Sequence, residues 1–155
     1  MGATKILVVD DHQIVREGVR SLLGTLRPAW TVSEAGDGAQ AIDLIQNAAP
    51  DLVIMDITMP GSSGFEVASR LRSSGFDRPI LMFTMHESAR LTNEAQEAGT
   101  QGYVLKSQAV EDLVRAIDAL LRGGTFFGME SAPQGAPDKP KLGLIFFRAF
   151  APNFS

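Results

Sequence analysis

The chain has 155 residues, of which 45% are hydrophobic and 21% charged, proportions typical of one folded globular domain. Fourteen Lys and Arg against eighteen Asp and Glu give a net charge of −4, which disfavours binding to nucleic acid or to an anionic membrane surface. The sequence has no cysteine, which excludes disulfides and thiolate metal sites, and two histidines make a histidine-rich zinc site improbable. Because it shows neither a signal-peptide pattern nor an apolar run long enough to cross a membrane, we expect a cytoplasmic protein.

Short apolar runs alternate with longer segments of helical periodicity. Continuous apolar runs are typical of strands that are buried on both faces, and they occupy residues 6–9, 30–35 (the weakest), 52–55, 80–83 and 103–105. Apolar residues at helical spacing occupy residues 14–26, 41–48, 65–71, 89–98 (the weakest) and 110–121. Strands that alternate with helices pair in parallel through right-handed crossovers. The pattern therefore predicts a doubly wound α/β fold, a five-stranded parallel sheet with helices on both faces.

The composition changes after this alternating region. Residues 131–141 are rich in proline, and residues 142–155 are apolar and rich in phenylalanine. We therefore expect a folded domain over residues 1–127 and a linker over residues 128–141. Residues 142–155 form an apolar tail whose role stays open.

Polar residues follow four of the predicted strands. Asp10 and Asp11 follow the first strand, Asp56 the third, Thr84 the fourth and Lys106 the fifth. Taken singly, an Asp at such a position is most often a helix N-cap, and a Thr or Lys is most often a turn residue or a solvated end. Ligands of open parallel sheets, however, bind outside the carboxyl ends of the strands. We therefore expect the five side chains to meet at one edge of the sheet.

Three clustered carboxylates repel one another and need a counter-charge. Oxygen ligands favour Mg²⁺, with Mn²⁺ as the alternative, and Mg²⁺ bound by few carboxylates usually also contacts a phosphoryl group. We expect Asp10 and Asp11 to hold the metal and Asp56 to accept a phosphoryl group as an aspartyl phosphate. Lys106 would place a positive charge, and Thr84 a hydroxyl, against the phosphoryl oxygens.

Several motifs resemble the receiver domain of two-component response regulators. They are K-I-L-V-V-D-D-H at residues 5–12, D-I-T-M-P-G-S-S-G at 56–64, F-T-M-H-E at 83–87 and G-Y-V-L-K-S at 102–107. D-D-H, T-M-H-E and the segment L-L-R-G-G-T-F-F at residues 120–127 are similar to receivers with a LuxR-type helix-turn-helix output domain. The resemblance covers about residues 4–127. It implies a flavodoxin-like sheet of strand order 2-1-3-4-5 with five helices.

The resemblance also implies a role for each residue at the strand ends. Asp56 matches the aspartate that is phosphorylated by the phosphohistidine of a sensor kinase, and Lys106 matches the lysine that assists the transfer. Thr84 and Tyr103 match the residues that switch conformation on phosphorylation. The implied Mg²⁺ ligands are Asp10, Asp11, Asp56 and the backbone carbonyl of Thr58.

The sequence departs from the broad receiver pattern in two places. Ser107 stands where many receivers have proline, so whether the Lys106–Ser107 bond is cis stays open. Met85 is larger than the residue that many receivers have there, and with His86 it would screen the phosphoryl site. We expect His12 to begin a helix beside the acidic pocket rather than to bind metal.

Two functions are compatible with these residues. The first is a phosphorylation-switched signalling module, which assists its own phosphotransfer and dephosphorylation but is otherwise no enzyme. Its output, transcriptional in the family, would use the face formed by residues 89–98, 103–105 and 110–121, through a homodimer or a partner. Residues after 141 lack a basic recognition helix, so only an output domain absent from this chain would bind DNA. The alternative is a small Mg²⁺-dependent phosphate-ester hydrolase, although Thr58 stands where such enzymes usually have a second Asp.

Overall fold

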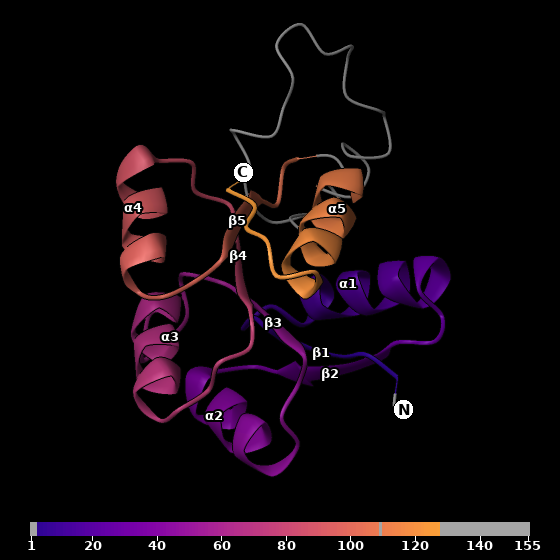
Figure 1. Cartoon of the computed structure of the whole chain (residues 1–155), viewed down its shortest axis with the longest axis horizontal. Helices are drawn as coiled ribbons and strands as arrows, with labels where there is room; N and C mark the ends of the chain where they lie inside the picture. Colours follow the sequence, from indigo (N-terminus) through magenta and orange to yellow (C-terminus); the bar gives the residue numbers. More distant parts are fainter. Residues whose placement is uncertain (1–2, 109, 128–155) are drawn as a thin grey trace, which may run out of the picture.

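The five predicted strands form one parallel sheet. The computed structural model describes residues 3–108 and 110–127, so the predicted linker and tail, residues 128–155, lie outside the described residues. The elements are β1 (Lys5–Val9), α1 (Gln13–Leu26), β2 (Thr31–Ala35), α2 (Gly38–Asn47), β3 (Leu52–Met55), α3 (Gly64–Ser73), β4 (Ile80–Thr84), α4 (Ala89–Glu97), β5 (Gly102–Leu105) and α5 (Val110–Leu121). The strand order is β2-β1-β3-β4-β5 with every pair parallel, which confirms the predicted α/β fold (Figure 1).

Helices cover both faces of the sheet, as continuous apolar strands require. One hydrophobic cluster joins the sheet to α1 and α5, and a second joins its other face to α2, α3 and α4 (Figure 1). Every residue of β3 and β4 is buried, whereas β2 alternates between exposed and half-buried residues and only its last residue, Ala35, is buried. The alternation follows from the position of β2 at the edge of the sheet, and it explains why the run at residues 30–35 is the weakest in the sequence.

The loop from Asp56 to α3 is fixed by close packing and by a capping box. Ser63 accepts a hydrogen bond from the backbone N–H of Glu66, and the Glu66 side chain accepts one from the backbone N–H of Ser63. The next residue, Gly64, packs directly on the loop, because a Cβ atom there would lie 2.2 Å from the carbonyl oxygen of Asp56. Glycine at this position therefore lets α3 begin immediately beside the end of β3.

The chain returns to the sheet after α5. Phe126 pairs with Gly102 in an isolated parallel bridge, and the Tyr103 N–H donates to the Phe126 carbonyl at 2.8 Å. Phe126 and Phe127 are both buried. This segment extends the folded region to the end of the described residues and covers the outer edge of β5.

The described residues contain no helix that is long and apolar enough to span a membrane. Their peptide bonds are all trans, including the bond between Lys106 and Ser107.

Candidate functional site

The register of the sheet brings the polar strand ends to one edge. Asp10 and Asp56 follow the neighbouring strands β1 and β3, and the Asp56 N–H donates to the Val9 carbonyl at 3.0 Å. Thr84 and Lys106 are placed in the same way by β4 and β5, since the Lys106 N–H donates to the Thr84 carbonyl at 2.7 Å. The predicted convergence of these residues thus follows from parallel pairing.

The Lys106 ammonium group lies between two of the acidic side chains. Its Nζ is 2.8 Å from Asp10 Oδ2 and 3.4 Å from Asp56 Oδ2. Lys106 and Asp10 are each only 1% exposed, and the ring of Phe83 lies 5.9 Å from Nζ. A charge this deeply buried is tolerated because it is paired. The lysine is therefore held by Asp10 at a position 3.4 Å from the carboxylate that we expect to react.

Asp56 is a carboxylate whose negative charge is disfavoured by its surroundings. Burial raises its pKa to about 6, and the nearby Asp10 adds to this rise, whereas Lys106 and a hydrogen bond from the Thr58 backbone lower it. The raised pKa means that the attraction of Lys106 does not fully offset the cost of ionising Asp56 in this buried position. An additional cation would stabilise the ionised form of Asp56.

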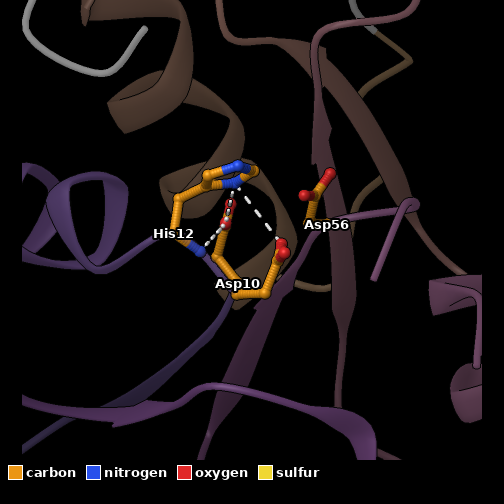
Figure 2. Close-up of side chains that lie close together, drawn as sticks. Asp10, His12 and Asp56 are labelled. Carbon is orange, nitrogen blue, oxygen red and sulfur yellow. Dashed lines mark hydrogen bonds and ion pairs between the residues drawn. The ribbon is translucent and has the colours of Figure 1, made fainter. Parts of the chain in front are cut away.

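Asp11 and His12 complete the acidic cluster. Asp11 Oδ1 is buried and accepts no hydrogen bond, although His12 Nδ1 lies 3.3 Å away. The His12 ring faces the Asp10 carboxylate, and Asp56 lies nearby on the neighbouring strand (Figure 2). One ligand atom from each of these four residues lies within 4.8 Å of the others. A buried carboxylate oxygen without a donor, among further oxygens, fits a divalent cation.

The predicted switch residues both contact the backbone of one residue, His86. The Thr84 hydroxyl accepts a hydrogen bond from the His86 N–H at 3.3 Å, and the Tyr103 hydroxyl donates to the His86 carbonyl. Tyr103 is buried, and burial together with the charge of Glu87 raises its pKa to about 12. The sequence motifs did not reveal this link, because it runs through backbone atoms that any residue would supply.

Asp11, His12, Asp56, Thr84 and Lys106 line one pocket of about 390 Å³, whereas Asp10 and Tyr103 are not among its lining residues. Thr58, which is exposed, lines this pocket, as do Met85 and His86, and the screening role of Met85 and His86 stays a prediction. The ligand role of the Thr58 carbonyl stays a prediction. The lining residues are Asp11, His12, Asp56, Thr58, Met59, Pro60, Thr84, Met85, His86 and Lys106.

Arg16 supports the site from α1 and was missed by the sequence analysis. Its Nη1 donates to the backbone carbonyl of Asp10 at 2.6 Å, and its Nε donates to Glu34 at 3.0 Å. His12 is the N-cap residue of α1, as expected, although its side chain makes no capping bond. The spacing of polar residues along α1 does not predict either hydrogen bond of Arg16, because both depend on tertiary structure.

A flavodoxin-like parallel sheet with an acidic pocket and a buried lysine at its strand ends has the architecture of a receiver domain. The chain matches the response regulator receiver domain family over residues 6–118, and it belongs to that family. It is thus a phosphorylation-switch signalling domain of two-component systems.

Particular relatives include LuxR-family regulators. The chain is 41% identical to a LuxR-family two-component response regulator from an Aurantimonas species, with a TM-score of 0.78 over 83% of this chain and 92% of that one. It is 40% identical to the response regulator MprA of a Mycobacterium species over 141 residues, 91% of this chain and 57% of the relative. It is 34% identical to the response regulator UvrY of Escherichia coli over 84% of this chain and 60% of the relative. The chain therefore spans a little over half the length of these curated relatives.

Proposed function

We propose that this receiver accepts a phosphoryl group on Asp56 from the phosphohistidine of a sensor histidine kinase, in a reaction that requires Mg²⁺ or, as the alternative, Mn²⁺. The observation that carries the proposal is the position of the Asp56 carboxylate. It is buried at the end of β3, 3.4 Å from the Lys106 ammonium group and beside the Asp10 and Asp11 carboxylates. The family membership supports the same assignment.

The residues of the pocket account for the transfer. A carboxylate oxygen of Asp56 forms a bond to phosphorus while the bond from phosphorus to the donor imidazole nitrogen breaks, and that nitrogen keeps the electron pair. Lys106 offers its charge to one phosphoryl oxygen, and Thr84 offers its hydroxyl to another. Asp10, Asp11, Asp56 and the Thr58 carbonyl would hold the metal ion, which supplies positive charge against the equatorial oxygens when bound.

The switch would begin at the loop between β4 and α4. A phosphoryl group adds roughly −1.5 to −2 charge and new acceptor oxygens, which attract the Thr84 hydroxyl. Thr84 then gives up its bond with the His86 N–H, and the loop that also binds the Tyr103 hydroxyl shifts. α4 is suited to move with the loop, because Ala95 is its only fully buried residue.

The output would use the face formed by α4, β5 and α5, through a homodimer or through a protein partner. The LuxR-family relatives favour a transcriptional output, in which an output domain outside this chain would contact DNA. We assign the receiver to residues 1–127, a linker to 128–141 and an apolar tail of open role to 142–155, in a cytoplasmic protein without membrane contacts. Beyond assisting its own phosphotransfer and dephosphorylation, the domain would have no enzymatic activity.

Intact mass measurement tests the proposal directly. Wild type and Asp56→Asn are incubated with Mg²⁺ and a small acyl phosphate, with EDTA as the control. Wild type should gain the mass of one phosphoryl group only with Mg²⁺, and Asp56→Asn should gain none. A gain that persists in Asp56→Asn would contradict the assignment. Steady turnover of a phosphate ester by wild type but not by Asp56→Asn would favour the alternative, a small phosphate-ester hydrolase.

A further inference from the structure

The His12 side chain lies against the acidic pocket, although an N-cap residue of α1 does not need this orientation. The residue is the N-cap of α1, but its side chain makes no capping hydrogen bond. The imidazole faces the acidic pair instead, with Nδ1 3.2 Å from Asp10 Oδ1 and 3.3 Å from Asp11 Oδ1. The ring is 43% exposed, so it forms the solvent side of a cluster whose Asp10 side chain is only 2% exposed.

The two distances from His12 Nδ1, which are ion-pair distances in the metal-free pocket, are also close to the spacing of neighbouring ligand atoms around one ion. With metal–ligand bonds of about 2.1 Å, neighbouring ligands of an octahedral ion lie roughly 3 Å apart and opposite ones roughly 4 Å apart. His12 Nδ1 stands at the first of these separations from both acidic residues, and the whole cluster with Asp56 lies within 4.8 Å. The His12 backbone N–H also holds Asp10 Oδ1 at 2.8 Å, which orients that carboxylate toward the ring.

Contrary to the expectation from the sequence that His12 only begins a helix, we propose that His12 Nδ1 is a ligand of the metal site, so that an imidazole nitrogen is added to the oxygen ligands proposed above. The inference rests on the proposed function, since it uses the same carboxylates. It changes the preference of the site, because imidazole suits Ni²⁺ and other late transition ions, whereas Mg²⁺ and Mn²⁺ prefer oxygen ligands. His12 would therefore determine which metals compete for the receiver.

Electron spin resonance of bound Mn²⁺ tests this directly in the full chain. Spin-echo modulation spectra of Mn²⁺ with wild type should show coupling to one imidazole ¹⁴N nucleus. The coupling should disappear in His12→Phe, which keeps a ring but removes both nitrogens. It should persist in His86→Phe, the matched control, because His86 is the only other histidine and also lines the pocket.

Calorimetric titration provides a second measurement. His12→Phe should weaken Ni²⁺ binding by about tenfold or more, whereas its Mg²⁺ affinity should change by less than about threefold. Equal losses for both ions would overturn the inference, because they would indicate a general disturbance of the pocket. Unfolding midpoints in EDTA identify a variant that has failed to fold; if His12→Phe does so, the spectrum of His86→Phe remains decisive, because His12 is then the single histidine in the chain.

The outcomes separate the inference from the function on which it rests. Bound Mn²⁺ without nitrogen coupling, or with a coupling that survives in His12→Phe, would overturn the role of His12 and leave the carboxylate site standing. Mn²⁺ that remains free in solution in the presence of wild type would contradict the proposed metal site itself. Coupling that is lost only in His12→Phe would establish the nitrogen ligand.

Discussion

The chemistry of the pocket depends on a carboxylate that the fold keeps partly out of water. Asp56 is 5% exposed, and its pKa is raised to about 6 by burial and by the neighbouring Asp10, despite the attraction of Lys106. The folded state therefore binds a proton at Asp56 more tightly than the unfolded state does. Ionised Asp56 destabilises the fold above pH 6, and this cost falls as the pH decreases through 6 toward the ordinary value of 3.8. The ionised Asp56 thus destabilises the metal-free fold, as we expect of a site whose carboxylates are stabilised by a bound cation.

Asp56→Asn should accordingly stabilise the metal-free protein. We expect its free energy of unfolding at pH 7.5 in EDTA to exceed that of wild type by about 1 to 3 kcal/mol, because the amide keeps the shape of the carboxyl without its charge. The gain should shrink as the pH is lowered through 6, and saturating Mg²⁺ should reverse it by stabilising wild type alone. Urea unfolding measures both effects. The exposed Asp43→Asn is the control, and a wild type as stable as Asp56→Asn at pH 7.5 in EDTA would contradict the argument.

At the scale of elements, the loop between β4 and α4 joins the pocket to the buried tyrosine. Its residue His86 donates its N–H to the Thr84 hydroxyl and accepts the Tyr103 hydroxyl at its carbonyl. If a phosphoryl group attracts the Thr84 hydroxyl, the hydrogen bond between Thr84 and the His86 N–H weakens. The environment of Tyr103, which bonds to the His86 carbonyl, then changes. The chain contains a single tyrosine, so an environment-sensitive label on that residue type gives one signal.

Thr84→Ala should separate phosphorylation from this response. We expect the variant to gain the phosphoryl mass at Asp56, since the hydroxyl is one of several contacts, and we expect its fluorotyrosine resonance to stay unchanged. Wild type should shift that resonance on phosphorylation, as seen by ¹⁹F NMR. Thr92→Ala in α4 is the matched control and should behave as wild type, because its hydroxyl bonds to the Ser88 carbonyl and not to the pocket. An unchanged wild-type resonance after phosphorylation would refute the coupling.

The segment after α5 is an element that sequence periodicity did not predict. Gly102 lies against it, since a Cβ atom there would be 2.6 Å from Leu81 Cδ1 and 3.0 Å from the Phe126 carbonyl oxygen. Gly102→Ala should therefore destabilise the protein by about 1 to 3 kcal/mol through overpacking. Gly24→Ala in α1, where nothing lies within 4 Å, should instead stabilise it by about 0.5 to 1 kcal/mol. Denaturant unfolding compares the two, and a Gly102→Ala as stable as wild type would show that the segment is not held against β5.

The sequence predicts the strands whose residues form a continuous apolar run. Buried strands produce continuous apolar runs, so β1, β3, β4 and β5 were predicted to within a residue or two, and parallel pairing then placed their polar ends together. The strand order came from the family resemblance rather than from periodicity. Contacts that depend on tertiary structure left no such signal: the Arg16 side chain on the Asp10 carbonyl and the pairing of Phe126 with Gly102.

At the scale of the whole molecule, different helices cover the two faces of the sheet. α1 and α5 lie together on one face and are joined at the surface by the ion pair between Arg27 and Asp118 at 2.6 Å. α4 lies on the other face, and the edge strand β5 lies between α4 and α5 (Figure 1). The proposed output face therefore combines the loosely anchored α4 with the firmly packed α5. A change in α4 alone is sufficient to alter the shape of that face.

Phosphorylation should therefore change the association of the whole chain. If the α4–β5–α5 face forms a two-fold homodimer, the same patch of both copies makes the interface, and each contact between the copies occurs twice. A substitution that reverses one charge therefore changes two contacts of the dimer. Sedimentation velocity should show a larger dimer fraction for wild type in Mg²⁺ and an acyl phosphate than for wild type in EDTA. Arg115→Glu, at an exposed position of α5, should reduce that fraction severalfold while the phosphoryl mass at Asp56 is still gained. Arg70→Glu, exposed on α3, should dimerise as wild type does, and equal losses in both variants would assign the association to net charge rather than to this face.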